Sequence, residues 1–399
     1  MLWSGQVVST IGTRVTGVAY PLLVLAETGS PAKAGVVGFA QTLPYILFYL
    51  PAGALVDRWD RKRTMIVADG GRTLALGSLA IALALDEFTF AQVVAVAFVE
   101  GTLFVFFSLS ESAALPQIVP KEQLPTAVAQ NQARIQGADL VGQPLGGALF
   151  GISKQLPFAA DAISYAASFV SLFFIRTRFQ EERPRSVTKL RAEMLEGVRW
   201  LWGQPFMRAG VLLVAGSNFA FSALILALIV RAKSLGASSA TVGVMLAFLG
   251  GGAIVGSLIA PWVQRRVHAK VIMIGSFWAW ALGAFVSAFV ESPYALGAIW
   301  AVGGIFGPIF NVAFSTYRYA LVPDRLLARV GSAALVVAWG AIPLGQLTAG
   351  ILLERIGGVD TILLVAAASA AVGLAASLLR TISRTIRTAP RAEELLTSA

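Results

Sequence analysis

The sequence reads Gly53-Ala54-Leu55-Val56-Asp57-Arg58-Trp59-Asp60-Arg61-Lys62-Arg63 between two long apolar runs. Four residues of this short segment are basic. In a membrane protein such a cluster beside a span stays on the cytoplasmic side, because Lys and Arg in short loops resist translocation. The segment therefore predicts a cytoplasmic turn between two membrane spans and sets the expected orientation of the whole chain.

The composition is typical of a polytopic membrane protein. Hydrophobic residues make up 57% of the chain, charged residues 13%, and the mean hydropathy is +0.75, far from the values of soluble domains. Cysteine is absent and His268 is the single histidine, so we expect no metal and no cofactor. The net charge of +10 favours anionic lipid headgroups, and not nucleic acid, as the partner of the basic loops.

A window of about 20 residues predicts an all-α membrane protein with twelve spans. They cover residues 3–25, 34–56, 64–85, 89–111, 129–151, 157–176, 208–230, 241–263, 271–290, 294–316, 331–353 and 361–380. An even number of spans places both termini on one side. The external turns hold few basic residues and the internal turns many, so we expect a multi-pass protein of the cell's inner (cytoplasmic) membrane with both termini cytoplasmic.

Short elements recur in the two halves of the chain. Val119-Pro120 returns as Val322-Pro323 and Gly53 returns as Gly256, both 203 residues later. Such a repeat predicts two pseudo-symmetric six-helix bundles. We expect the N-terminal bundle at 1–179, a cytoplasmic linker with an amphipathic helix at 180–206, the C-terminal bundle at 207–380 and a cytoplasmic tail at 381–399.

Three motifs resemble the major facilitator superfamily. The segment 53–63 is similar to its G-x-L-a-D-r-x-G-r-k loop between spans two and three, with Asp60 at the second glycine. Residues 115–124 and 196–202 are similar to the loop after span four and to the linker helix of the enterobactin-exporter and macrolide-efflux branch of drug:proton antiporters. The resemblance implies the twelve-span major facilitator fold and a secondary transporter, not an enzyme.

Span five holds a motif similar to the antiporter signature G-P-x-x-G-G. It reads Gly142-Gln143-Pro144-Leu145-Gly146-Gly147, with the proline one place later than in the signature. Proline bends a helix and glycine lets a neighbouring helix approach. The resemblance implies that this motif favours export over import.

Three ionisable residues lie near the middle of predicted spans: Arg14, Glu100 and Asp139. Such residues are costly in the membrane and need a partner or water. Because one cation cannot neutralise two carboxylates, one carboxyl group would tend to hold a proton, so we expect proton coupling at these residues. A buried ion pair that only locks the bundle is the alternative.

The same superfamily resemblance implies a substrate cavity lined by spans one, four, seven and ten. Glu100, Phe104, Phe107 and Glu111 share one face of span four. Position 97 is Ala, where many proton antiporters of this superfamily have Arg. The expected cavity residues are Arg14, Glu100, Phe104, Phe107, Asn218, Ser222, Gly307, Asn311 and Ser315.

The resemblance also implies an inner gate at Gly53, Asp57, Arg58 and Arg61. The aspartate would approach a helix of the second bundle, and the basic residues would reach acids such as Glu111 or Asp69. Such contacts would form only when the inner gate is shut, and they would bias alternating access.

These features predict a monomeric secondary transporter that exports a medium-sized amphipathic or anionic small molecule, of antibiotic or siderophore type, in exchange for protons. The sequence holds no G-x-x-x-x-G-K-[ST] loop for ATP. An uncoupled facilitator or lipid transporter of the same fold is one alternative. A membrane receptor or scaffold that does not transport is another.

Overall fold

The computed structural model describes residues 2–56, 58–120, 123–175, 179, 190–323 and 326–379. These residues form thirteen α-helices and no strand. The helices are α1 (Leu2–Thr28), α2 (Pro31–Val56), α3 (Arg61–Ala84), α4 (Phe90–Ile118), α5 (Leu124–Ile152), α6 (Leu156–Phe174), α7 (Leu190–Gly203), α8 (Pro205–Ser234), α9 (Ser239–Arg266), α10 (Ala269–Ser287), α11 (Pro293–Leu321), α12 (Leu327–Ile356) and α13 (Gly358–Leu378).

Eleven of these helices are long and apolar enough to cross a membrane. The long helix α5 falls outside this set because its sequence is more polar, and the linker helix α7 is short, with 14 residues. The twelve predicted spans each overlap one long helix, but the bounds differ by a few residues, and most helices begin earlier than predicted. For example, α3 begins inside the charged turn, because the Asp60 side chain accepts a hydrogen bond from the Arg63 backbone N–H at 2.9 Å and caps the helix.

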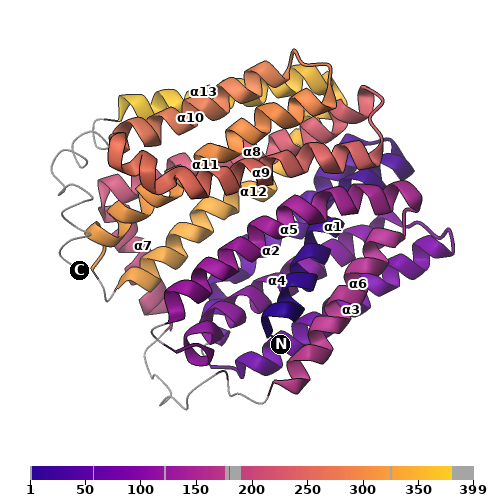
Figure 1. The fold of residues 1–399 in the computed structure, drawn as a ribbon, viewed down its shortest axis with the longest axis horizontal. Helices are drawn as coiled ribbons and strands as arrows, with labels where there is room; N and C mark the ends of the chain where they lie inside the picture. Colours follow the sequence, from indigo (N-terminus) through magenta and orange to yellow (C-terminus); the bar gives the residue numbers. More distant parts are fainter. Residues whose placement is uncertain are drawn as a thin grey trace.

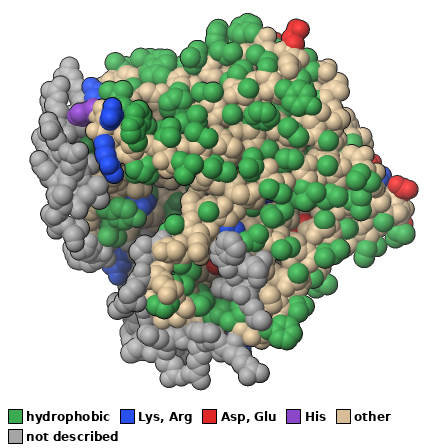
Figure 2. All heavy atoms as spheres, viewed as in Figure 1, with side chains coloured by type: hydrophobic (Ala, Val, Ile, Leu, Met, Phe, Trp, Pro, Cys, Tyr) green, Lys and Arg blue, Asp and Glu red, His purple; other side chains and the backbone are tan. Residues whose placement is uncertain are grey.

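The helices form two groups that follow the order of the chain (Figure 1). Helices α1 to α6 pack on one another, and helices α8 to α13 form the second group. The two groups, called here the N-terminal and C-terminal bundles, touch through α2 with α12 and α5 with α9, while α7 packs on α12. In Figure 2, hydrophobic side chains spread along both bundles, and Lys and Arg side chains gather at the end where α7 lies.

The bundles approach most closely at the end that holds the connection between α1 and α2, called here the 29–30 end. A Cβ on Gly35 of α2 would lie 2.7 Å from the Gln346 carbonyl oxygen of α12, so only glycine fits there. The Glu354 side chain of α12 accepts hydrogen bonds from the Ser30 hydroxyl and, at 3.0 Å, from the Ala32 backbone N–H. Small residues thus let the two backbones touch.

The hydrophobic core differs between the two ends of the molecule. At the 29–30 end one cluster of buried residues joins both bundles and includes Val24 of α1 and Ala227 of α8. Towards the other end the buried residues of the described chain form two separate clusters, one around Met65 in the N-terminal bundle and one around Met207 in the C-terminal bundle. Among the described residues, a shared apolar core therefore holds the two bundles together at the 29–30 end, and not at the other end.

Candidate functional site

Arg14 of α1 forms an ion pair with Asp139 of α5. The Arg14 Nε lies 2.8 Å from Asp139 Oδ1, and the two side chains are 39% and 24% exposed. Gln143 donates a hydrogen bond to the same oxygen at 3.4 Å. A Cβ on Gly250 of α9 would lie 3.1 Å from the Asp139 Cβ, so this pair lies against the other bundle. A movement between the bundles would change its surroundings.

Glu100 of α4 does not join that pair. It is 2% exposed and accepts a hydrogen bond from the Tyr20 hydroxyl at 2.8 Å. The three residues predicted near mid-span therefore divide into an Arg14 and Asp139 pair and a separately held Glu100. Position along a helix sets the depth of a residue, whereas the rotation of each helix decides which neighbour it meets.

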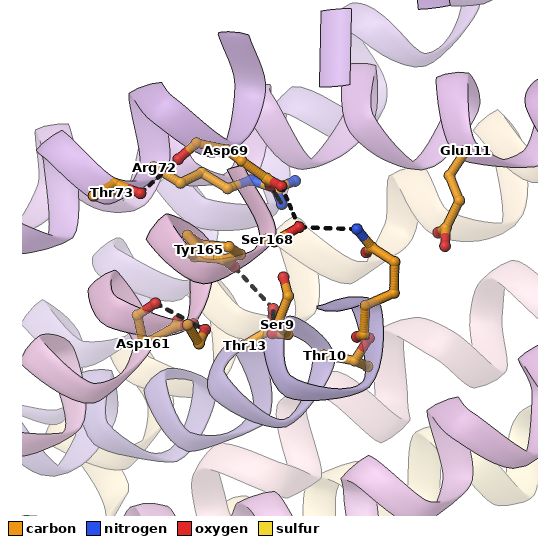
Figure 3. A network of polar contacts seen from close by, with 12 residues as sticks. Ser9, Thr10, Thr13, Asp69, Arg72, Thr73, Glu111, Asp161, Tyr165 and Ser168 are labelled. Carbon is orange, nitrogen blue, oxygen red and sulfur yellow. Dashed lines mark hydrogen bonds and ion pairs between the residues drawn. The ribbon is translucent and has the colours of Figure 1, made fainter. Parts of the chain in front are cut away.

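Asp69 and Arg72 of α3 belong to a buried polar network (Figure 3). Arg72 Nη1 lies 3.6 Å from Asp69 Oδ1, and the two side chains are 2% and 0% exposed. Ser168 of α6 donates a hydrogen bond to Asp69 Oδ2 at 2.6 Å and accepts one from Gln6 at 2.9 Å. In the described residues, Arg72 Nε and Nη2 have no hydrogen-bond acceptor. This guanidinium therefore holds unused donors inside the bundle.

Aromatic rings enclose the Arg72 guanidinium. Its carbon lies 5.0 Å from the ring centres of Phe107 and Tyr165 and 5.6 Å from that of Phe104. Such contacts stabilise a buried cation by about 0.5 to 2 kcal/mol each. Phe104 and Phe107 were predicted to face the substrate. In the structure their rings contact the buried Arg72 guanidinium. The ring of Tyr45 lies 5.7 Å from Phe104 on its other side.

Asp161 of α6 is a buried carboxyl group that the sequence analysis did not select. It is 0% exposed and accepts hydrogen bonds from Thr16 at 2.6 Å and Ser164 at 2.9 Å. It lies five residues from the start of α6, a place that looks like a helix end in the sequence. The signal that could have found it is the polar stripe of Asp161, Ser164, Tyr165 and Ser168 on one face of an otherwise apolar helix.

Around Arg72 the N-terminal bundle thus buries three acids, Asp69, Glu100 and Asp161. Asp69, Glu100 and Asp161 all interact electrostatically with Arg72. A carboxylate without a counter-charge is very costly to bury, so a single guanidinium does not suffice for three ionised acids. In the described residues no three possible ligands converge closely enough to hold a metal ion. The arrangement is chemically suited to holding protons.

The predicted inner gate is changed in one respect. Glu111 of α4 forms a two-pronged ion pair with Arg134 of α5, at 2.7 and 3.1 Å, whereas Arg61 donates to the Ala113 carbonyl at 2.7 Å. The side chain of Arg134 is only 5% exposed. Glu111 was predicted, with Asp69, as an acid that the basic residues of the motif would reach, but Arg134 of the same bundle binds both of its oxygens with its planar guanidinium.

The remaining residues of the predicted gate are Gly53, Asp57 and Arg58. Arg58 is exposed, and a Cβ on Gly53 would meet no atom within 4 Å. Asp57 lies outside the described residues. Its expected contact with the second bundle therefore stays a prediction.

The glycines of the span-five motif face two different neighbours. A Cβ on Gly142 would lie 2.6 Å from the Arg14 Cβ, and one on Gly146 would lie 2.5 Å from the Val15 carbonyl oxygen, so both glycines pack against α1. A Cβ on Gly147 would lie 2.2 Å from the Ser239 carbonyl oxygen of α9. The motif thus holds α5 against its own bundle and against the opposite one. Pro144 also lies at the contact with α9, beside Gly243.

The predicted polar residues of span seven face α12. Asn218 donates a hydrogen bond to the Ala338 carbonyl at 2.9 Å, and Ser222 donates to the Ile342 carbonyl at 3.0 Å. Ile342 directly precedes Pro343, which interrupts the hydrogen-bond ladder of α12, and Ala338 lies five residues before it. These side chains therefore join α8 to α12, and the place of Ser222 in a substrate cavity stays a prediction.

The polar stripe predicted on span ten divides between two environments. Asn311 is exposed and Ser315 is half-buried. Gly307 lines a cavity of about 310 Å³. The walls of this cavity come from the C-terminal bundle: Ser217, Asn218, Phe221, Leu224, Leu249, Ala253, Phe277, Trp280, Trp300, Gly303, Gly304, Gly307, Pro308, Ser369 and Val372. Of the predicted cavity residues, only Asn218 and Gly307 lie on these walls.

The sequence matches the family described as transmembrane secretion effector over residues 1–394. The chain belongs to this family. It is thus a major facilitator superfamily transporter, as its motifs suggested, and not an enzyme.

Named relatives are exporters. The chain is 26% identical over 359 residues to the multidrug efflux pump Tap of Mycolicibacterium fortuitum, covering 87% of both chains. It is 23% identical to macrolide efflux protein A of Streptococcus pyogenes over 89% of both chains. It is 24% identical to the enterobactin exporter EntS of Salmonella typhi over 81% of this chain and 78% of the relative.

Solved transporter structures share the fold. A mutant of the nucleoside transporter NupG superposes with a TM-score of 0.74 at 15% sequence identity, over 94% of this chain and 99% of the other. At this identity the likeness concerns the fold alone. It agrees with the two-bundle architecture described above.

Proposed function

We propose that this transporter exports a medium-sized amphipathic or anionic small molecule, of antibiotic or siderophore type, in exchange for protons. The observation that carries the proposal is the buried cluster of Asp69, Glu100 and Asp161 around Arg72 in the N-terminal bundle. The names of the relatives, which are efflux pumps and a siderophore exporter, support the direction of transport and the substrate class.

The cluster would carry protons because its charges cannot balance otherwise. Asp69 forms an ion pair with Arg72 at 3.6 Å and would stay ionised beside it. Glu100 and Asp161 accept hydrogen bonds from hydroxyl groups and would be protonated at rest. When one of them releases its proton, the unused donors of Arg72 offer the new carboxylate a partner.

The Arg14 and Asp139 pair would connect this chemistry to the movement of the bundles. It lies where α1 and α5 meet α9, and an anionic substrate would compete with Asp139 for the guanidinium. Arg14 would therefore select for negative charge. This role is expected in alternating access, in which one bundle rocks against the other around a shared site.

The orientation of the chain is part of the proposal. The basic loops would be cytoplasmic, which places the 29–30 end outside and both termini inside. The outer end would then be closed by the apolar core that joins the bundles. Asp57, Arg58 and Arg61 would contribute to closure at the inner end, and the transporter would work as a monomer.

Transport into proteoliposomes under an imposed pH gradient tests the proposal. A panel of antibiotics and siderophores would be measured with the native chain and with Glu100→Gln, Asp161→Asn and Asp139→Asn. A gradient of one pH unit can support about tenfold accumulation per exchanged proton. We expect Glu100→Gln and Asp161→Asn to lose this accumulation while downhill flux persists. Glu87→Gln, which changes an exposed acid between α3 and α4, is the matched control.

An uncoupled facilitator of the same fold is the second candidate. The half-exposed Arg14 and Asp139 pair favours it, since an ion pair can bind substrate without moving protons. Flux that ignores the pH gradient in the native chain would establish the facilitator and reduce the buried acids to a structural brace.

A further inference from the structure

A cavity of about 310 Å³ lies inside the C-terminal bundle, away from the buried acids. Its walls come from α8, α9, α10, α11 and α13, and none of the lining residues belongs to the N-terminal bundle. Its volume is at the lower end of the range for small-molecule sites, about 300 to 1,000 Å³. It is therefore large enough for a ring system but small for a whole drug-sized molecule.

The internal repeat explains why this space exists. Helices α4 and α11 correspond residue for residue, since each bound of α11 lies 203 positions after that of α4. At this offset Glu100 corresponds to Gly303, and Phe104 corresponds to Gly307. Both glycines lie on the cavity wall. The acid and the ring that fill the interior of the first bundle are thus replaced by hydrogen atoms in the second.

The walls of the cavity are aromatic and neutral. The indole N–H of Trp280 donates to the Gly303 carbonyl at 2.9 Å, and that of Trp300 donates to the Ser287 hydroxyl at 3.1 Å. Because both indole donors are already paired, the two tryptophans offer ring surface and not polar groups. Phe221 packs edge-on against Trp300 at 6.0 Å and continues this wall. No ionisable side chain is among the lining residues.

We propose that this cavity binds a neutral, planar aromatic ring system. Flat rings pack in offset or edge-on contacts with tryptophan and phenylalanine. A charged ligand would lose its hydration without gaining a counter-charge. The site is independent of proton coupling and would bind its ligand even in a chain that does not transport. Because a single bundle supplies all the lining residues, rocking of the bundles would leave the walls intact, and the ligand would be held in every state of the cycle.

Fluorescence of a bound probe tests the site in the full-length protein in lipid nanodiscs. The neutral fluorophore 1-aminoanthracene would be titrated, with empty nanodiscs subtracted, and compared with anthracene-1-carboxylate. We expect saturable binding of the neutral probe and affinity for the anion weaker by about tenfold or more. Equal affinity for both probes would overturn the assignment of a neutral site.

Two variants fill the cavity from different helices, α11 and α13. In Gly307→Leu the new Cβ meets no atom within 4 Å, so the side chain grows into open space. In Ser369→Leu only a hydrogen bond to Val365 of the same helix is lost. Each should weaken 1-aminoanthracene binding by about tenfold or more. Because the two act from different helices, a folding defect in one, detected by thermal unfolding, leaves the other as the test.

The matched controls lie on α3 of the other bundle. Gly77→Leu also places its Cβ in open space, and Ser78→Leu also removes a hydroxyl bonded to its own helix, at Ala75. Both should bind the probe like the native chain. The proposal is overturned if the cavity-filling variants bind normally, or if the control variants lose binding to the same extent.

Discussion

The interiors of the two bundles differ in kind although their folds repeat. Among the described residues, every buried charged side chain belongs to the N-terminal bundle: Arg61, Asp69, Arg72, Glu100, Arg134 and Asp161. The buried polar residues of the C-terminal bundle are the hydroxyl side chains Ser222, Ser276, Ser287 and Thr361. The interior of the N-terminal bundle therefore holds charged side chains, and that of the C-terminal bundle holds a cavity with aromatic walls.

The difference teaches that one fold can divide two tasks between its repeats. Buried charges stabilise a fold poorly, because desolvation cancels much of the attraction between them. Their presence in one bundle is thus better explained by use than by stability. In our account the first bundle handles protons and the second binds a neutral aromatic ring system.

The largest effect is expected for Arg72→Met, which removes the guanidinium and keeps most of the side-chain volume. It tests whether the charged interior of the N-terminal bundle depends on this cation. Loss of one partner of a buried charge pair typically costs about 3 to 5 kcal/mol. We expect this loss in the free energy of unfolding, measured by denaturant titration in detergent, together with loss of transport. Arg63→Met, at an 87% exposed side chain, should change neither. Normal stability of Arg72→Met would show that the acids need no counter-charge.

Tyr20→Phe sharpens the comparison, because it reports the protonation of Glu100. The substitution removes the hydroxyl that donates to Glu100 at 2.8 Å. If Glu100 is neutral, the loss should be that of an ordinary hydrogen bond, about 0.5 to 1.5 kcal/mol, and if it is ionised, about 1.5 to 3 kcal/mol. Our account predicts the smaller value at neutral pH. Tyr165→Phe, which breaks a hydroxyl-to-hydroxyl bond with Thr13, gives the neutral reference for the same measurement.

The smallest effect is expected at the surface of the same bundle. Lys154, in the connection between α5 and α6, contacts Glu27 at 3.0 Å and Asp86 at 3.1 Å. Hydrogen bonds to these carboxylates raise the pKa of Lys154. A raised lysine pKa adds stability that is complete below its ordinary value and is lost as pH rises through the raised one. Lys154→Met should therefore shift the melting temperature slightly and equally at pH 6 and pH 9. A shift that differs between the two values would contradict this assignment.

The sequence predicts the helices well, because membrane spans depend on local hydropathy. The charged turn at 53–63 and the repeat offset also indicate the superfamily correctly. Contacts between distant helices are harder to predict. The depth of Glu100 could be counted along its span, but its bond to Tyr20 depends on how α1 and α4 are rotated. Asp161 binds Thr16 of α1, a contact across 145 residues that no local pattern contains.

The same limit applies to the C-terminal bundle. Gly307 was expected to face a substrate, but the cavity beside it depends on Gly303 and on rings from α8 and α10. An empty space has no sequence signal of its own. It could be inferred only by comparing equivalent positions of the two halves, where Gly303 and Gly307 correspond to Glu100 and Phe104.

The central claim, that the first bundle stores protons, can be tested by infrared spectroscopy of the purified protein at neutral pH. Protonated carboxyl groups give a C=O stretch distinct from that of carboxylates, and those shielded from solvent exchange slowly into D₂O. We predict such a signal in the native chain, reduced in Glu100→Gln and in Asp161→Asn and unchanged in Glu87→Gln. A native spectrum without buried protonated carboxyl groups, or one unaffected by both substitutions, would contradict the account.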